Sequence, residues 1–519
     1  MSLVIAGRIV PMSNDATVAA NDAAVFKGKV WIGDDGRIAA VTQGASKGPP
    51  GFEQAAVVDV GTDLVVPGLI DLHSHLAYAS LPLWVEPNRI VPFLHHNIWP
   101  TRPTYAADVT WPAYAFVVAS PAELLAYAEV RALVGGTTCI QGSPPSNRPL
   151  DGWLARNVED ETLGGTIDRD RVRTSTLTLK PDQLGEKADQ MRAGSTFIYH
   201  CAEGQPGSIV NREYKAARSA GCLQPRFVAI HCNAIDPAAF GNWTTPGATV
   251  WSPFSNLWLY GTTTDVPAAI ANGLTVCIGS DWGPSGTRNA LGELKVASLV
   301  ASARNWSLTH IDLVRMVTAN PGDVLSGSWG VPLGRLQPGA LGDVTVFAAK
   351  AGADAFRTIV EATERDVRLV VVGGRAQCGM STLMTAAGAT GTSEITVAGE
   401  KRALALTRIE DRSTPWSFDS VLARMEAVRA DPKGEINKAR GALASWAGRL
   451  DQPDAPMRLA LDMPTGIAPI GGLPKDLGQV KVPPLQPLAH DRAFFTSLTG
   501  RGFHGTLLDG LADFYRAAP

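Results

Sequence analysis

The sequence predicts an α/β fold, in which a (β/α)8 TIM-type barrel carries a small β-sandwich lobe and a C-terminal extension. Three observations support this prediction. Short apolar runs alternate with helical stretches between residues 67 and 335, as in βαβ units. Several of these runs end in polar residues, and barrel enzymes place their chemistry at such strand ends. Turn-rich β segments flank the barrel region at 1–66 and 336–385.

Size and charge favour a large globular enzyme. The chain has 519 residues, and single cores rarely grow beyond about 250–300 residues, so we expect a barrel with smaller lobes. The net charge of -3 offers no basic surface for nucleic acid. No signal sequence or run of about 18–20 apolar residues is present, and the six cysteines are scattered, so we expect a cytoplasmic protein with reduced thiols and no membrane partner. A homo-oligomer is compatible with the sequence.

The two flanking segments are expected to form one lobe. Residues 1–66 alternate short β-type runs with glycine-containing turns, which is typical of hairpins. A matching pattern returns at 336–385, after the barrel. We therefore predict a composite β lobe built from both segments, with the barrel at 67–335 between them.

Seven barrel strands and two of their helices can be placed from apolar runs and turn residues. Helices are expected at 121–136 and 182–194. An eighth strand is hardest to place, and 156–161 is the best candidate. The seven clearer strands are expected within 65–75, 135–142, 171–180, 195–204, 226–236, 248–256 and 274–283.

Two segments do not follow the barrel repeat. Residues 79–120 form a long connection that is rich in proline and aromatic residues, and such connections are usually functional or disordered. Its aromatic content argues against disorder. Residues 390–519 form an extension with a helical stretch around 417–450 and a proline-rich run, and its role is open.

A pair of histidines ends the first barrel strand. His73 and His75 flank Ser74, and side chains at i and i+2 of a strand point to one face, so both imidazoles can reach one metal. His200, His231 and Asp281 end other predicted strands. Together these residues are expected to converge on one rim of the barrel.

These motifs resemble those of the amidohydrolase superfamily. The run PGLIDLHSH is similar to the family's first-strand metal motif, HCAEG to its His-x-x-Glu, and IHC to its sixth-strand histidine. SPFSN and GSDWG resemble strands of the cytosine deaminase and chlorohydrolase-like branch. The resemblance covers about residues 1–385 and does not include the last 130 or so.

The resemblance implies roles for the matching residues. His73, His75, His200 and Asp281 would bind one divalent metal, Zn2+ or Fe2+, and such a metal activates water. Asp281 would accept a proton from that water. Glu203 would carry protons to the substrate and the leaving amine, and His231 would orient the nucleophile or polarise the substrate.

Lys180 leaves an alternative open. It ends a predicted strand where binuclear members of the superfamily carry a carboxylated lysine, and His231 would then bind a second metal. Glu203 favours the mononuclear branch.

Tryptophans near the strand ends indicate the substrate. Aromatic surfaces suit a small neutral aromatic or heterocyclic molecule, although packing between lobes is an equal explanation. The reaction is expected to be hydrolysis of a carbon–nitrogen bond other than a peptide bond, by deamination or by cleavage of an amide or urea; dechlorination and a non-catalytic binding barrel are weaker alternatives. The candidate substrate-binding residues are Trp84, Trp99, Trp258 and Trp282.

Overall fold

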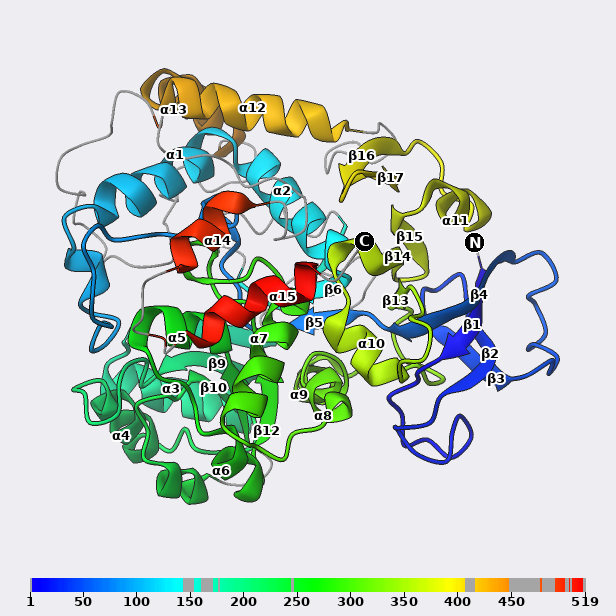
Figure 1. The fold of residues 1–519 in the computed structure, drawn as a ribbon, viewed down its shortest axis with the longest axis horizontal. Helices are drawn as coiled ribbons and strands as arrows, with labels where there is room; N and C mark the ends of the chain where they lie inside the picture. Colours follow the sequence, from blue (N-terminus) through cyan, green and yellow to red (C-terminus); the bar gives the residue numbers. More distant parts are fainter. Residues whose placement is uncertain are drawn as a thin grey trace.

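A computed structural model provides the structure of the chain (Figure 1). It describes residues 2–142, 154–159, 171–175, 178–243, 247–406, 416–447, 477, 491–499, 504 and 506–516, and the statements below concern these residues.

A nine-stranded mixed sheet forms one side of the molecule (Figure 1). Its order is β16-β17-β15-β14-β13-β4-β1-β2-β3, and β13 pairs antiparallel with β4, so strands from both flanking segments contribute to one sheet. Two further strands, β16 and β17, come from the segment after residue 390. The strands are β1 (Leu3–Ile9), β2 (Phe26–Ile32), β3 (Ile38–Gln43), β4 (Ala56–Pro67), β13 (Val344–Phe347), β14 (Val367–Val372), β15 (Arg375–Gly379), β16 (Ser393–Val397) and β17 (Glu400–Leu404).

Eight short strands form two parallel sheets in the central part of the chain. One has the order β5-β6-β7 and the other β12-β11-β10-β9-β8. A parallel bridge between Ser74 and Asp281, just beyond β5 and β12, joins the two sheets on one side. The strands are β5 (Leu69–Asp71), β6 (Thr137–Ile140), β7 (Arg156–Asn157), β8 (Val172–Ser175), β9 (Thr196–Cys201), β10 (Phe227–His231), β11 (Ala248–Trp251) and β12 (Thr275–Ile278).

One apolar cluster collects side chains from seven of these strands. Ile70 of β5, Val228 of β10 and Cys277 of β12 meet in it, and each is at most 1% exposed. Leu325 and Trp329 of helix α9 (Ala319–Trp329) also belong to the cluster. Strands buried in this way have nearly continuous apolar sequences, which is why their positions could be predicted from the sequence.

Helices connect the parallel strands, and those expected around 121–136 and 182–194 are present. The segment SPFSN differs from the expectation. Strand β11 ends at Trp251 and helix α5 begins at Pro253, because proline suits the first helical position and cannot continue the strand ladder. The helices are α2 (Pro121–Val134), α3 (Pro181–Arg192), α4 (Asn211–Ser219), α5 (Pro253–Tyr260), α6 (Val266–Ala271), α7 (Ala290–Ala303), α8 (His310–Arg315), α9 (Ala319–Trp329), α10 (Ala355–Glu361) and α11 (Ser381–Ala386), with 3-10 turns η5 (Pro237–Asn242), η6 (Gly283–Ser285) and η7 (Glu364–Asp366).

The long connection after β5 contains helical structure. A short 3-10 turn η1 (Leu76–Tyr78) precedes an irregular stretch, and η2 (Trp99–Thr101) and the π-helical turn η3 (Ala106–Thr110) follow. Helix α1 (Trp111–Ala119) completes the connection. We refer to residues 79–110 as the aromatic segment.

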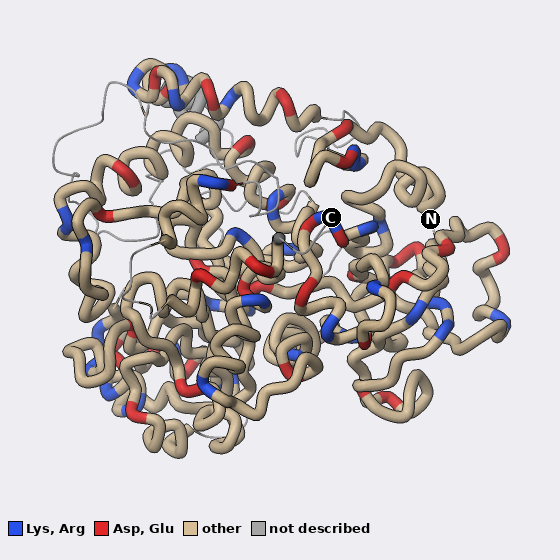
Figure 2. The backbone as a smooth tube through the Cα atoms, viewed as in Figure 1, with Lys and Arg blue, Asp and Glu red and all other residues tan. Residues whose placement is uncertain are grey.

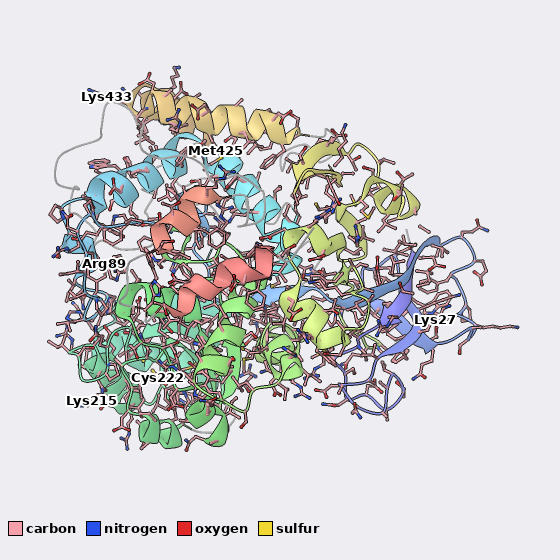
Figure 3. All side chains as sticks on the ribbon, in the orientation of Figure 1. Lys27, Arg89, Lys215, Cys222, Met425 and Lys433 are labelled. Atoms are coloured by element: carbon pink, nitrogen blue, oxygen red, sulfur yellow. The ribbon has the colours of Figure 1, made fainter. Side chains whose placement is uncertain are left out.

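The C-terminal helices cover two parts of the molecule. Helix α12 (Phe418–Ala430) lies beside α1 and α2, and Met425, which is fully buried, belongs to it (Figures 1 and 3). Helix α13 (Pro432–Ala447) follows. The last elements lie near α5 and α7: helix α14 (Arg492–Leu498), the turn η9 (Leu507–Gly510) and helix α15 (Leu511–Arg516). Phe494 of α14 stacks on Phe254 of α5, with ring centroids 5.4 Å apart.

Charged residues of both signs are interspersed along the chain (Figure 2). Among the described residues, none of the helices combines the length and the apolar character that a membrane crossing requires.

Candidate metal and catalytic site

The predicted metal ligands meet where parallel strands end. His73 and His75 follow β5, His200 lies near the end of β9, and Asp281 follows β12. The Asp281 N–H donates to the His73 carbonyl over 2.7 Å. Extended pairing therefore continues past β5 as far as Ser74, which explains why His73 and His75 point to the same side although both lie beyond the strand.

Four donor atoms lie close together in this cluster. Nε2 of His73 is 3.1 Å from Nε2 of His75 and 3.0 Å from Nε2 of His200. Oδ1 of Asp281 is 3.3 Å from Nε2 of both His73 and His75. His73, His75 and Asp281 are buried, and His200 is partly buried.

The separations fit a tetrahedral cation. Four donors around zinc, with bonds of about 2.0–2.1 Å, lie about 3.3–3.4 Å from one another. The four distances given above, from 3.0 to 3.3 Å, agree with this geometry to a few tenths of an ångström, and His200 takes part in them through its distance to His73. The donor set of three imidazoles and a carboxylate also suits zinc or iron. The residues present could therefore hold a divalent metal.

Contacts behind the imidazoles favour the same conclusion. Nδ1 of His73 lies 2.8 Å from the Ser252 hydroxyl, and Nδ1 of His200 lies 3.4 Å from the Ser175 carbonyl. The Ser175 carbonyl can only accept, which places the ring proton of His200 on Nδ1, and the Ser252 hydroxyl can accept from Nδ1 of His73 in the same way. Each ring then keeps a lone pair on Nε2 for a metal. Burial, followed by the neighbouring histidines, holds the pKa of His73 and His200 well below the ordinary range, so these rings are neutral.

A buried carboxylate that the sequence analysis did not single out supports the cluster. Asp71 accepts hydrogen bonds from the Ser280 N–H and hydroxyl and from the His73 N–H. Burial raises its pKa to about 6. Because Asp71 bonds to the residues beside His73 and Asp281, it holds the two ends of the site in register. Its position in the run LIDLHSH was the available signal.

Glu203 lies beside the cluster and is 6% exposed. Its Oε1 accepts a hydrogen bond of 2.6 Å from the Tyr260 hydroxyl and is 3.6 Å from Nε2 of His231. Burial raises the pKa of Glu203 to about 7. A carboxyl with such a pKa can both take up and release a proton near neutral pH. The sequence analysis does not identify Tyr260, because it expects a strand within 248–256, whereas helix α5 begins at Pro253 and brings Tyr260 to the site.

His231 ends β10 and has no exposed surface. Its Nε2 lies 3.9 Å from Oδ2 of Asp281, and its Nδ1 lies 3.1 Å from Nδ2 of Asn256. Geometry alone also groups His231 with His73 and His200 as a set that could share a metal. The role of His231 therefore depends on which of its ring nitrogens carries the proton.

Two site residues occupy unusual backbone conformations. His231 has φ of 67° and Asp281 has φ of 60°, in the left-handed region that residues other than glycine rarely adopt. Such conformations cluster at functional sites, where the surrounding structure holds them. Here they direct both side chains inward at the ends of β10 and β12.

His96 is a site residue that the sequence analysis did not identify. Its ring Nε2 lies 2.7 Å from Oε1 of Glu213, and its backbone N–H donates to the Glu203 carbonyl. Burial is the largest single effect and lowers the pKa of His96, but the hydrogen bond to Glu213 and the charges of the Glu203 and Glu213 carboxylates together outweigh it, so the pKa is raised. The aromatic segment therefore brings an imidazole with a raised pKa toward Glu203. No spacing in the sequence indicated this contact.

The four tryptophans lie in two environments. Trp99 and Trp282 have ring centroids 5.0 Å apart, and Tyr105 contacts both Trp84 and Trp99. Trp99 also donates its Nε1–H to the Tyr260 hydroxyl over 2.9 Å. Trp258 has no exposed surface and stacks on Phe254. Trp99 is therefore the tryptophan that hydrogen bonds connect to Glu203.

Lys180 does not lie with the histidines. Strand β8 ends at Ser175, and Lys180 is an exposed residue before helix α3, where its N–H donates to Gln183 Oε1. The geometry therefore offers no support for a carboxylated Lys180 bridging two metals.

Sequence comparisons relate the chain to deaminases. The profile of the amidohydrolase family matches residues 64–376. A 5-methylthioadenosine/S-adenosylhomocysteine deaminase of Symbiobacterium thermophilum is 25% identical in an alignment of 413 residues that covers 71% of this chain and 91% of that protein. A 5'-deoxyadenosine deaminase of Methanothrix thermoacetophila is 24% identical in an alignment of 315 residues that covers 55% of this chain and 75% of that protein.

Solved structures share the fold. An adenosine deaminase of Xanthomonas campestris with bound zinc has a TM-score of 0.58 at 16% identity, covering 84% of this chain and 98% of the other. A variant of an atrazine chlorohydrolase of Arthrobacter aurescens, complexed with zinc and atraton, has a TM-score of 0.59 at 15% identity, covering 82% and 99%.

Proposed function

The chain belongs to the amidohydrolase family, and we propose that it uses one divalent metal to deaminate a small aminated heterocycle. The observation that carries the proposal is the convergence on His73 of His75, His200 and Asp281, whose donor atoms lie 3.0 to 3.3 Å from its Nε2, with Glu203 beside them. His73, His75, His200 and Asp281 would hold the metal, zinc by preference and iron as the alternative.

The proposal includes a closed (β/α)8 barrel. The Ser74–Asp281 bridge already joins the two parallel sheets on one side, and side chains from seven strands share one apolar cluster. Closure between β7 and β8 would complete an eight-stranded barrel whose carboxyl ends carry the site. The division into a composite lobe at 1–66 and 336–385, a barrel at 67–335 and an extension at 390–519 remains part of this proposal, with one change: β16 and β17 of the extension belong to the sheet of the lobe.

Each residue of the site has a distinct task in the proposed reaction. A bound divalent cation supplies a Lewis acid that makes water nucleophilic near neutral pH. Asp281 accepts a proton from the attacking water. Glu203, with a pKa of about 7, moves protons to the ring nitrogen next to the carbon under attack and then to the departing amine. His231 lies close enough to Glu203 and Asp281 to contact the group under attack.

The substrate class follows from the relatives and the surrounding side chains. Several relatives are named as deaminases of adenosine derivatives, which favours deamination over amide or urea hydrolysis. Aromatic rings of the segment containing Trp99 and Tyr105 lie next to Tyr260, and such rings can stack on a planar heterocycle. The six buried free cysteines are compatible with the reducing conditions of the cytoplasm, where we expect the enzyme to act.

Metal analysis and an activity assay test the proposal. We expect about one zinc or iron per chain in the purified protein, a large decrease in Asp281→Ala and no change in the surface variant Lys180→Ala. The metal-loaded protein should release ammonia from adenosine-type nucleosides or from other aminated heterocycles. Two metals that depend on Lys180 would indicate a binuclear enzyme, and a wild-type protein that takes up no metal would indicate a binding protein.

A further inference from the structure

We propose that Asn256 fixes the ring proton of His231 on Nε2, so that His231 serves as a hydrogen-bond donor in the site and does not bind the metal. The proposal rests on the proposed function, since it concerns the same site. It follows from the order of donors and acceptors in a buried chain of four side chains: Trp251, Thr263, Asn256 and His231.

The first step is the orientation of the Asn256 amide. Trp251 donates its Nε1–H to the Thr263 hydroxyl over 2.7 Å, and an indole N–H can only donate. The Thr263 hydroxyl therefore acts as an acceptor toward Trp251 and can direct its own proton to Oδ1 of Asn256, 3.3 Å away. With Oδ1 facing a hydroxyl proton, the NH2 group of Asn256 faces His231.

All four side chains are buried, so water cannot take over these contacts. Trp251, Asn256 and His231 have no exposed surface, and Thr263 is 5% exposed. Rotating the amide by 180° would set its NH2 group against the Thr263 hydroxyl, which already accepts from Trp251. It would also remove the acceptor of the Thr263 proton. The network thus favours one amide orientation.

The second step is the protonation of His231. Nδ2 of Asn256 is a donor only, and it lies 3.1 Å from Nδ1 of His231. Nδ1 must then carry a lone pair. A charged imidazolium has a proton on both nitrogens, so the ring must be neutral with its single proton on Nε2.

The third step is where that proton points. Nε2 of His231 has no hydrogen-bond partner among the described residues and is buried, 3.6 Å from Glu203 and 3.9 Å from Asp281. A buried N–H without a partner is costly, so it is expected to meet an acceptor when the site is filled. The acceptor would be the oxygen that adds to the substrate carbon under attack, or a ring nitrogen beside that carbon.

His231 thereby differs from the metal ligands. Nδ1 of His73 faces a hydroxyl and Nδ1 of His200 faces a carbonyl, and both oxygens can accept a proton and leave Nε2 free to bind a metal. Nδ1 of His231 faces a donor, which has the opposite effect on Nε2. Asn256 is therefore a positioning residue that assigns His231 to the substrate.

The test measures the ring protons directly. In protein labelled with 15N-histidine, two-bond correlation spectra distinguish protonated from lone-pair nitrogens, and His231→Gln identifies the signal of His231. We expect Nε2 of His231 to be protonated in the wild type, both metal-free and with one zinc. A proton on Nδ1 in the metal-free wild type, or the loss of the Nε2 proton on adding one zinc per chain, would overturn the proposal.

Asn256→Asp provides the complementary variant, because a carboxylate accepts from Nδ1 and should move the proton there. We expect the tautomer to switch and kcat to fall roughly a hundredfold with a smaller change in KM, as for loss of a donor that acts in the transition state. Asn233→Asp adds a carboxylate at another buried asparagine, which bonds to the Gly204 N–H, and should leave the His231 tautomer unchanged.

These measurements separate this inference from the proposed function. The tautomer is read in metal-free protein without any substrate, so an inactive enzyme still reports on Asn256. If Asn256→Asp does not fold, the wild-type spectrum alone decides the question. An unchanged tautomer in a folded Asn256→Asp variant would show that Asn256 does not control His231.

Discussion

The Tyr260 hydroxyl donates a 2.6 Å hydrogen bond to Oε1 of Glu203 and accepts one of 2.9 Å from Nε1 of Trp99. Glu203 follows β9, Tyr260 ends α5 and Trp99 belongs to the aromatic segment. The orientation of the proposed proton carrier therefore depends on two elements that lie far from it in the sequence. The aromatic segment contributes to the site through this contact as well as through His96.

Tyr260→Phe should lower kcat/KM by roughly tenfold to a hundredfold, since a hydrogen bond to a charged group contributes about 1.5–3 kcal/mol. The Tyr260 hydroxyl lowers the pKa of Glu203, against the larger effect of burial. Its removal should therefore move the limb of the pH–rate profile that reports Glu203 to higher pH. Metal content should not change. Tyr114→Phe, in α1, is the control, and an unshifted profile would contradict this role.

Ser252→Ala should weaken metal binding by roughly tenfold to a hundredfold, because the hydroxyl 2.8 Å from Nδ1 orients the His73 ring. Competition with a chelator measures the affinity. Ser255→Ala is the matched control, since Ser255 is equally buried in the next turn and bonds to the Ser285 hydroxyl. Equal affinity in the two variants would show that Ser252 does not support the ligand.

The convergence of donor atoms could be predicted because parallel strands present their carboxyl ends on one edge. A recognisable apolar run ends at or near each of His73, His75, His200 and Asp281, so the sequence predicts that these residues approach one another. It does not predict the distances themselves, which are 3.0 to 3.3 Å for four of the donor pairs. The strand candidate at 156–161 was also correct in place, although β7 has only the two residues Arg156–Asn157.

The supporting residues could not be predicted in the same way. Asp71, Ser252 and Tyr260 act through contacts that depend on how α5 and the strand ends fold back on the ligands. His96 reaches the site only because the aromatic segment crosses the end of β9. Such contacts join residues 57 or more positions apart without any local periodicity, so a single sequence carries no signal for them.

Asp22→Asn should destabilise the protein by about 1 kcal/mol at pH 7. Arg315 of α8 donates two hydrogen bonds to Asp22, of 2.7 and 2.9 Å, and Arg315 is 31% exposed. The hydrogen bond lowers the pKa of Asp22 and burial opposes it. Because the folded-state pKa is below the unfolded value, this stability is present above about pH 4 and is lost as the pH falls through the folded-state pKa.

Urea unfolding of wild type and Asp22→Asn at pH 7 and near pH 3 measures this effect. The difference in unfolding free energy should shrink at the lower pH. Asp419→Asn, at an exposed position of α12, should show no difference at either pH. A difference that stays constant with pH would rule out the ion pair as its cause.

Phe494→Ala should destabilise the protein by about 3 kcal/mol, because a buried phenylalanine leaves a cavity when truncated. Phe494 packs on Phe254 in the first turn of α5, the helix that also carries Asn256 and Tyr260. The loss should therefore also lower kcat. Thermal unfolding and steady-state kinetics provide the two measurements, with the exposed Thr496→Ala as control. Unchanged kinetics would mean that α5 keeps its position without this contact.

The left-handed conformations of His231 and Asp281 have a consequence for protein engineering. A glycine or asparagine would adopt these backbone angles with less strain, by about 1 kcal/mol or more per position. A library screened for heat resistance alone would therefore be expected to collect such replacements and to lose catalysis with them. Any thermostabilised form of this enzyme should be sought with both codons held constant, so that added stability comes from elsewhere in the chain.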